Sequence, residues 1–396
     1  MNIRKKDNKN IFSYGKQYLD EDDIREVIQV LKSDWLTQGP KVEEFENTLG
    51  LKFGSEFVCA VSNGTAALHL TGLALGWGPD DIIITTPISF LSTANCILYS
   101  GAEPDFVDID PLTYTIDPNM VEQKTKQLKS KGKKVKAVIA VDYAGHPSDW
   151  DALRAIAKRY ELQLVNDNCH AIGASYKGDS QYAVKYADVA TLSFHPVKHI
   201  TTGEGGAVLT NNAEFYEKVE LLRTHGMTKK QNRLHGRKNP WYYEMVELGY
   251  NYRLTDFQCA LGISQMNKLD GFLKRRQKIA HRYNQAFSND ERFEIPLTSR
   301  DIQHAYHLYP LLVNFHKTSM NKTKLFKVLN NKDIRLQVHY IPIHLQPYYM
   351  NRFGFKLGDY PVAEKFYEKE ISLPIYYGLA DSQADFIVDT INSCIN

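Results

Sequence analysis

The stretch SFHPVKHITTGEGG, residues 193–206, decides the fold expected for this chain. It continues an apolar run and places Lys198 in a turn rich in hydroxyl groups and glycine. Pro196 restricts the backbone before the lysine, and the glycines after it permit tight turns. Earlier in the chain, Asp167 ends a second apolar run, Leu162–Val165. Both residues therefore lie where a strand gives way to a loop, the usual place for chemistry in α/β sheets.

A lysine and an aspartate in these settings suit pyridoxal phosphate. Lys198 can form a Schiff base with the cofactor, and Asp167 can keep the pyridine nitrogen protonated. An acid at a buried strand end needs a partner, because an unpaired buried charge is costly. Asp167 alone could equally cap the next helix, so the inference depends on the pair.

A third segment, SNGTAA at residues 62–67, joins an expected strand to an expected helix. Backbone N–H groups at a helix start, including that of Gly64, suit a phosphate, and Thr65 adds a hydroxyl donor. Ser193 could contact the same phosphate. An ordinary capping turn would use similar residues. Because no GxxxxGK[ST] or GxGxxG motif occurs, the chain offers no better phosphate cradle.

Two further side chains could contact the cofactor ring. His170 follows Asp167 by three residues and could lie near the ring hydroxyl, or could be a core histidine. Phe90, which ends the TTPISF stretch, could stack on the ring, although an aromatic residue after a strand is commonly part of the core.

Composition excludes several function classes. The 396 residues carry 48 basic and 46 acidic side chains, a net charge of +2, which gives no electrostatic footprint for nucleic acid or a membrane surface. No apolar run approaches the roughly 20 residues needed to span a bilayer, and no secretory signal is visible. The five cysteines are scattered, without a CxxC pair or any predicted metal site. We therefore expect a reducing, cytoplasmic location.

Short apolar runs alternate with helical patterns along most of the chain, which predicts an α/β fold with a mainly parallel sheet covered on both faces. A helix is expected from Asp20, with an apolar face of Ile24, Val27, Ile28 and Leu31. The pattern predicts a large domain over residues 30–265, a smaller α+β domain over 266–396, and an N-terminal segment, 1–29, packed with the smaller domain. The expected strands are 57–61, 82–86, 106–109, 135–141, 162–165, 189–194 and 207–210, with helices at 65–75, 93–99 and 274–287.

Ordered motifs across nearly the whole chain resemble one family, the DegT/DnrJ/EryC1/StrS sugar aminotransferases of pyridoxal-phosphate fold type I. The motifs are WLTQGP (35–40), SNGTAALHL (62–70), TTPISF (85–90), NDNCHAIGA (166–174), the lysine segment, HGM (225–227) and GYNYRL (249–254). Two departures from the family pattern are Asn166, where an acid or serine is commoner, and a long loop between His225 and Leu248.

The resemblance implies roles residue by residue. Lys198 would be the Schiff-base lysine and general acid/base, Asp167 the pyridine-nitrogen partner, Phe90 the stacking ring and His170 the neighbour of the ring hydroxyl. Gly64, Thr65 and Ser193 would surround the phosphate, and Asn251 would reach the cofactor phosphate of a neighbouring subunit in a homodimer. The substrate pocket would include Tyr14, Asp34, Trp35, Leu36, Thr37, Gln337, Val338, His339 and Tyr340.

Within the family, the combination of VDYAGH, QVHY (337–340) and EISLP (370–374) is most similar to members that make a pseudaminic acid precursor. These members move an amino group from glutamate to C4 of a UDP-4-keto-6-deoxy-N-acetylhexosamine. The alternatives are a GDP- or dTDP-linked keto-deoxysugar, a dehydratase, and a non-catalytic sugar-nucleotide-binding protein. Family dehydratases have a histidine at the lysine position. Because Lys198, and not His199, stands five residues after Ser193, the spacing favours amination.

Overall fold

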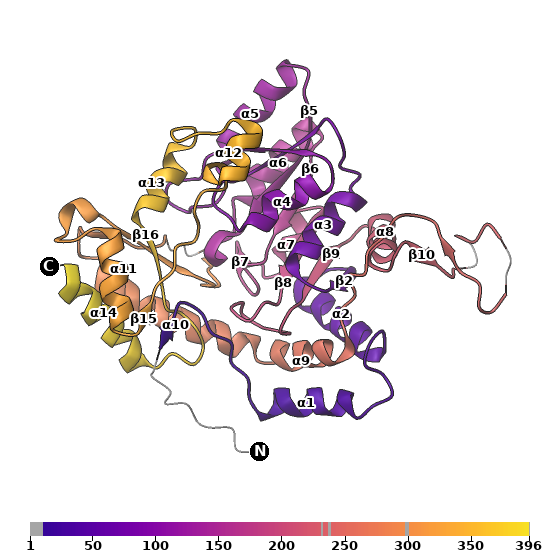
Figure 1. The fold of residues 1–396 in the computed structure, drawn as a ribbon, viewed down its shortest axis with the longest axis horizontal. Helices are drawn as coiled ribbons and strands as arrows, with labels where there is room; N and C mark the ends of the chain where they lie inside the picture. Colours follow the sequence, from indigo (N-terminus) through magenta and orange to yellow (C-terminus); the bar gives the residue numbers. More distant parts are fainter. Residues whose placement is uncertain (1–10, 231–232, 237–238, 298–300, 396) are drawn as a thin grey trace.

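A seven-stranded sheet forms the centre of the molecule (Figure 1). The computed structural model describes residues 11–230, 233–236, 239–297 and 301–395. The strands, in spatial order, are β2 (Phe57–Val61), β9 (Gly206–Thr210), β8 (Val189–Ser193), β6 (Gln163–Asp167), β5 (Lys134–Val141), β3 (Asp81–Thr85) and β4 (Glu103–Phe106). Only β9 runs antiparallel to its neighbours in this sheet. The predicted mainly parallel α/β fold is confirmed.

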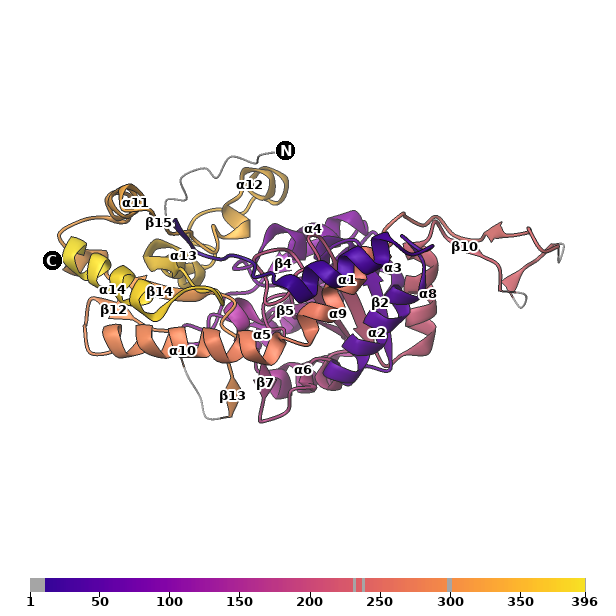
Figure 2. The same ribbon diagram turned by 90° about the horizontal axis from the view of Figure 1, so that it is seen from below.

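Helices cover both faces of this sheet, because successive strand residues point to opposite sides. On one side Ala60, Ala140 and Leu192 join a core with residues of α2, α6 and α9; on the other, Cys59 and Val208 pack with α3 and α8 (Figure 2). The helices are α1 (Glu21–Leu31), α2 (Pro40–Phe53), α3 (Gly64–Ala74), α4 (Leu91–Tyr99), α5 (Pro118–Ser130), α6 (Trp150–Tyr160), α7 (Tyr182–Tyr186), α8 (Ala213–Arg223), α9 (Asp256–Met266), α10 (Leu269–Phe287), α11 (Lys322–Asn331), α12 (Pro347–Phe353), α13 (Pro361–Lys369) and α14 (Asp381–Ile395).

Most predicted elements agree with the structure, and two differ. The strand expected at 106–109 is instead β4, Glu103–Phe106. Residues 109–116 close a turn of their own, in which Asp110 N donates to the Thr115 carbonyl at 2.8 Å, so the chain leaves the sheet early. Helix α10 starts at Leu269, five residues before the expected start, because the buried Leu269 and Leu273 extend its apolar face.

The C-terminal third forms a second core around an antiparallel sheet of β12 (Phe293–Glu294), β14 (Tyr309–Val313) and β16 (Glu370–Leu373). The N-terminal segment reaches it through β1 (Phe12–Ser13), which pairs with β15 (Ile334–Arg335). The remaining short strands are β7 (Ser175–Tyr176), which pairs with β13 (Ile302–Gln303), and β10 (Met227–Thr228), which pairs with β11 (Glu244–Met245). The predicted domain boundaries, which follow residues 29 and 265, stay a prediction.

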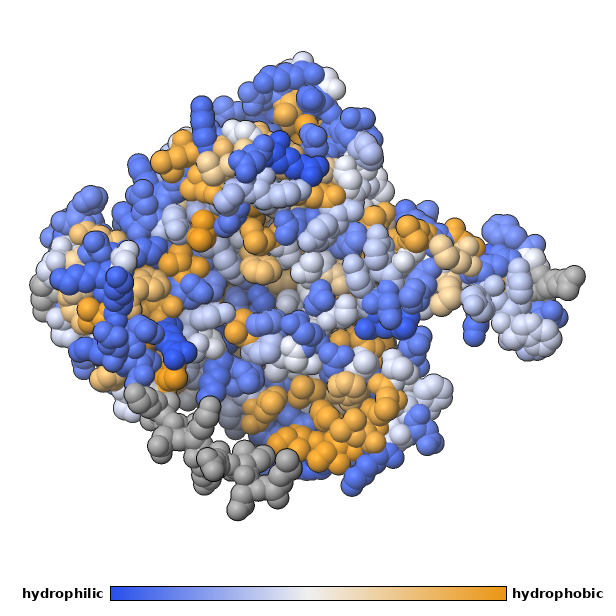
Figure 3. Space-filling model, in the orientation of Figure 1, coloured by the Kyte–Doolittle hydropathy of each residue, from blue (hydrophilic) through white to orange (hydrophobic). Residues whose placement is uncertain are grey.

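Helix α1 forms where expected, with Asp20 as its cap, and packs against α9. Its predicted apolar face is nevertheless largely open to solvent. Ile28 is 43% exposed and Leu31 is 55% exposed. Figure 3 shows an apolar area at the lower edge of the molecule, where α1 lies in Figure 1. Within the described ranges, no helix combines the length and the apolar character that crossing a membrane requires.

Candidate active site

Lys198 lies in the loop that connects the adjacent strands β8 and β9. The base of this loop is closed by hydrogen bonds from Phe194 N to the Gly205 carbonyl (2.8 Å) and from Thr202 N to the Phe194 carbonyl (3.0 Å). At its end, a Cβ atom on Gly206 would lie 2.6 Å from the backbone of Asn63. The glycine therefore lets the lysine loop approach the start of α3, which carries the predicted phosphate turn.

One large cavity, of about 1110 Å³, collects most of the predicted site residues. It is lined by Lys198, Asp167, His170, Phe90, Gly64, Thr65, Ser193, Tyr14, Gln337, Val338, His339 and Tyr340, among others. Since these side chains come from β6, α3, the lysine loop and the C-terminal third, the fold brings together residues that are far apart in the sequence.

Asp167 is buried at the end of β6 and is held by two donors. The Thr93 hydroxyl donates to its Oδ2 at 2.7 Å, and the Cys169 N–H donates to its Oδ1 at 3.3 Å. Thr93 is itself bonded to Ser89 at 2.7 Å. These two hydrogen bonds fix the carboxyl group in place at the end of β6. A carboxylate that also opens onto the cavity fits the pyridine N–H of pyridoxal phosphate.

Lys198 is electrostatically suited to proton transfer. Burial lowers the pKa of its ammonium, while Cys169 and Asp167 partly oppose that shift. The Nζ atom lies 3.4 Å from Nε2 of His307, whose own pKa is held well below the usual range, first by burial and then by Lys198. The histidine is therefore neutral and can accept a hydrogen bond from the lysine.

The start of α3 has the features of an anion site. The Asn63 side chain accepts from Ala66 N at 2.8 Å and caps the helix. The N–H groups of Gly64 and Thr65 belong to the first turn, where intrahelical acceptors are missing. Ser193 packs directly against Gly64, since a Cβ there would lie 2.9 Å from the Ser193 Cβ. These groups fit a cofactor phosphate.

His170 and Phe90 both lie close to Tyr340 in the cavity. His170 Nε2 is 3.1 Å from the Tyr340 hydroxyl, and its Nδ1 faces the Ala144 N–H at 3.4 Å. Phe90 is 55% exposed, and its ring centroid is 6.1 Å from that of Tyr340.

Five predicted residues lie outside this cavity and are exposed: Asp34, Trp35, Leu36, Thr37 and Asn251. The 34–37 segment is attached to the start of α9, where Asp256 N donates to the Leu36 carbonyl at 3.0 Å. Asn251 forms a β-bridge with Thr224. The chain by itself does not bring these side chains to Lys198.

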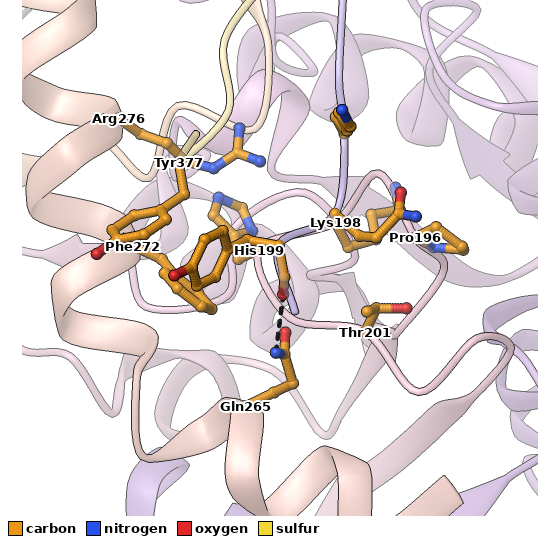
Figure 4. A pocket seen from close by; sticks show the side chains of 11 residues that line it. Pro196, Lys198, His199, Thr201, Gln265, Phe272, Arg276 and Tyr377 are labelled. Carbon is orange, nitrogen blue, oxygen red and sulfur yellow. Dashed lines mark hydrogen bonds between the residues drawn. The ribbon is translucent and has the colours of Figure 1, made fainter. Parts of the chain in front are cut away.

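The sequence did not predict three residues that support the site. His307 lies beside the Lys198 amine, Thr93 donates to Asp167, and Arg276 lines the smaller pocket that Lys198 also lines. The buried Arg276 donates to the carbonyls of Tyr306 (3.0 Å), His307 (3.2 Å) and Ile375 (2.9 Å). Figure 4 shows Arg276 beside His199, Phe272 and Tyr377 in a smaller pocket behind the lysine loop. The only sequence signal for His307 was a histidine two residues before the apolar strand β14.

Comparison with known proteins agrees with this geometry. The model of the DegT/DnrJ/EryC1/StrS aminotransferase family matches residues 17–392. The chain belongs to this family, and it is a pyridoxal-phosphate-dependent sugar aminotransferase.

Three relatives show the extent of the similarity. The UDP-4-amino-4,6-dideoxy-N-acetyl-beta-L-altrosamine transaminase of Campylobacter jejuni serotype O:2 is 39% identical, over 97% of this chain and 98% of its own length. The structure of Helicobacter pylori PseC, an aminotransferase involved in the biosynthesis of pseudoaminic acid, is 32% identical, with a TM-score of 0.86 over 97% of this chain and 99% of PseC. The putative sugar aminotransferase Spr1654 of Streptococcus pneumoniae, in its PLP form, is 29% identical, with a TM-score of 0.87 over 97% and 98% of the two chains.

Proposed function

We propose that the chain transfers an amino group from glutamate to C4 of a UDP-4-keto-6-deoxy-N-acetylhexosamine, a step in pseudaminic acid precursor biosynthesis in the cytoplasm. The observation that carries the proposal is the shared cavity of Lys198 and Asp167, lined on its far side by Gln337–Tyr340. The similarity to the Campylobacter transaminase over nearly the whole chain supports the choice of substrate.

Different residues of the cavity would bind different parts of the cofactor. Gly64, Thr65 and Ser193 would bind its phosphate, and Asp167 its pyridine nitrogen. Phe90 would stack on the ring, and His170 would lie beside the ring hydroxyl. When bound, pyridoxal phosphate supplies an electron sink for the carbon that loses its proton.

Lys198 would move the proton. It must lose its own proton to act as a base, and burial lowers its pKa in that direction. The amine would take the proton from Cα of glutamate in the first half-reaction and return one to C4 of the sugar in the second. Proton transfer of this kind typically contributes about 10²–10⁴-fold to the rate.

The substrate end would be completed by a second subunit. Tyr14 and Gln337–Tyr340 line the cavity within one chain and would contact the sugar nucleotide. Residues 34–37 and Asn251 are exposed and outside it, so in a homodimer they would serve the cavity of the partner, Asn251 at the cofactor phosphate. The exposed apolar face of α1, near residues 34–37, supports an interface there.

The test is a panel of 4-keto sugar nucleotides with UDP, GDP or dTDP, each incubated with the holoenzyme and glutamate and followed by mass spectrometry. We expect amination of the UDP-N-acetyl substrate in preference to the others. Preference for a GDP or dTDP sugar would overturn the substrate and retain the reaction class. Lys198→Ala should abolish glutamate-dependent amination while still binding pyridoxamine phosphate. Borohydride reduction should fix the cofactor to the peptide that contains Lys198; a label elsewhere, or none, would favour the dehydratase alternative.

A further inference from the structure

A buried polar cluster lies behind His339, and the proposed function does not use it. His339 lines the large cavity, whereas Glu370 and Ser372, on β16, do not. Both of these side chains are fully buried. The Ser372 N–H donates to the Gln337 carbonyl at 2.8 Å, which attaches the strand to the cavity segment 337–340.

Hydrogen bonds join these three side chains in a chain, and the backbone N–H of His339 closes it into a ring. Glu370 Oε2 accepts from the backbone N–H of His339 at 3.0 Å. Glu370 Oε1 lies 2.5 Å from the Ser372 hydroxyl, and that hydroxyl lies 2.8 Å from Nδ1 of His339. Since Nδ1 is bonded within the ring, Nε2 is the nitrogen of His339 that remains for the cavity.

The direction of these bonds depends on one proton. Burial lowers the pKa of His339 to about 3, so the imidazole is neutral and only one of its nitrogens carries hydrogen. An ionised Glu370 accepts from Ser372, which must then accept from Nδ1–H, and Nε2 becomes an acceptor. A protonated Glu370 donates to Ser372, which donates to Nδ1, and Nε2–H becomes a donor.

We propose that Glu370, acting through the Ser372 hydroxyl, sets the tautomer of His339 and so decides whether Nε2 donates or accepts a hydrogen bond in the cavity. Glu370 and Ser372 are positioning residues in this scheme. Its ligand contact rests on the proposed function, since the ligand is taken to be a sugar nucleotide.

The surroundings of Glu370 favour its protonated form at neutral pH. Burial raises the pKa of Glu370 to about 8, against the opposing effects of Ser372, Lys322 and the His339 N–H. Lys322, on α11, donates to the Tyr367 carbonyl at 2.5 Å and forms no ion pair with Glu370 within the described residues. Burial lowers the pKa of Lys322 itself to about 8, so this side chain is not a permanent cation beside Glu370.

The other titratable groups that face Glu370 are weak acids. Burial holds the pKa values of the Tyr143 and Tyr340 hydroxyls well above their usual range, so both remain neutral. The Tyr143 hydroxyl donates to the His339 carbonyl at 2.5 Å. Glu368 raises the pKa of Lys322 and is not among the groups that shift the pKa of Glu370. The donor form, Nε2–H, therefore faces the cavity at neutral pH and suits a carbonyl oxygen, such as that of a keto or N-acetyl group.

The test compares the wild type with Glu370→Gln, using the full chain loaded with pyridoxal phosphate and ¹⁵N-labelled at histidine. The backbone N–H of His339 requires an oxygen at the Oε2 position, so the glutamine NH₂ must point to Ser372 and impose the donor form. Long-range ¹H–¹⁵N NMR distinguishes the two tautomers, and His339→Gln identifies the signals. The spectra are recorded at about pH 6.5 and about pH 9.5, on either side of the raised pKa of Glu370, about 8.

We expect Nε2–H at both pH values in Glu370→Gln, and a change from Nε2–H to Nδ1–H in the wild type. The same tautomer in both proteins at about pH 9.5 would overturn the proposal. Ser372→Ala removes the hydroxyl that links Glu370 to His339, so the tautomer of His339 should no longer depend on pH. Glu364→Gln is the matched control: Glu364 pairs with His344 at 2.9 Å, away from the cavity, and this variant should behave as the wild type does.

Binding of UDP-N-acetylglucosamine, measured by calorimetry, tests the ligand contact. Between the two pH values, the wild type should lose about threefold to tenfold more affinity than Glu370→Gln, the net effect of one hydrogen bond. An equal loss in both would overturn the contact. The tautomer is read without substrate, so it can be confirmed even if the panel of sugar nucleotides refutes the proposed function. If the enzyme is an active transaminase but the tautomer of His339 does not depend on Glu370, this inference alone is refuted.

Discussion

Replacing His307 should slow proton transfer by Lys198 without weakening substrate binding. Its Nε2 lies 3.4 Å from the lysine amine, and its ring contacts those of His170 (centroids 4.4 Å apart) and His199 (5.7 Å). A hydrogen bond of this kind has a typical net value of about 0.5–1.5 kcal/mol. If that contribution orients the amine in the transition state, His307→Leu should lower the rate by about threefold to tenfold.

His307→Gln is the matched control, because it also removes the ring but keeps an acceptor. Single-turnover absorbance measurements with glutamate should show a slower half-reaction in the leucine variant than in the glutamine variant, with similar KM values. Equal rates in the two variants would refute the role of the hydrogen bond. A change confined to KM would show that His307 acts on substrate binding instead.

The remaining predictions concern the cofactor, stability, assembly and pH. Thr93→Val removes the 2.7 Å bond to Asp167 and should raise the Kd for pyridoxal phosphate about tenfold or more, as measured by fluorescence titration; an unchanged Kd would contradict this. Arg276→Met leaves three buried carbonyls without their donor and should lower the free energy of unfolding by about 2–5 kcal/mol in urea titrations, whereas a loss within error would show that other donors replace it. Ile28→Glu, on the exposed face of α1, should convert the proposed homodimer to a monomer in light scattering with an unchanged far-UV spectrum, and a persistent dimer would place the interface elsewhere. Because the folded-state pKa of Glu370 is raised from 4.5 to about 8, the native state binds the extra proton between those values; the free energy of unfolding should therefore fall with rising pH over that window in the wild type, relative to Glu370→Gln. Parallel curves for the two proteins would contradict that assignment.

Residues at strand ends could be predicted from the sequence, because a strand, a turn and a helix start each have local signals. Lys198, Asp167 and Thr65 follow such signals, and all three reach one cavity. The contacts that support them have no local signal. Thr93 and His307 meet Asp167 and Lys198 only after distant segments pack together, so periodicity and spacing do not reveal them.

The apolar stripe of α1 shows a different limit. Its spacing correctly predicted an amphipathic helix. Periodicity indicates that the apolar face of such a helix packs against another surface, but it does not identify that surface. In the single chain Ile28 and Leu31 remain exposed. The exposed segment 34–37 has the same limit, since the sequence does not show which surface an exposed segment contacts.

The loop between β8 and β9 has an evolutionary consequence. Both of its ends leave neighbouring strands, and the ladder from Val189 paired with Thr210 to Ser193 paired with Gly206 holds them in place. The two ends of the loop are therefore held by the sheet and not by the side chain at position 198. A single codon change at this position could exchange one reaction class for another while the sheet persisted, so descendants of one ancestral scaffold could diverge in chemistry without passing through an unfolded intermediate.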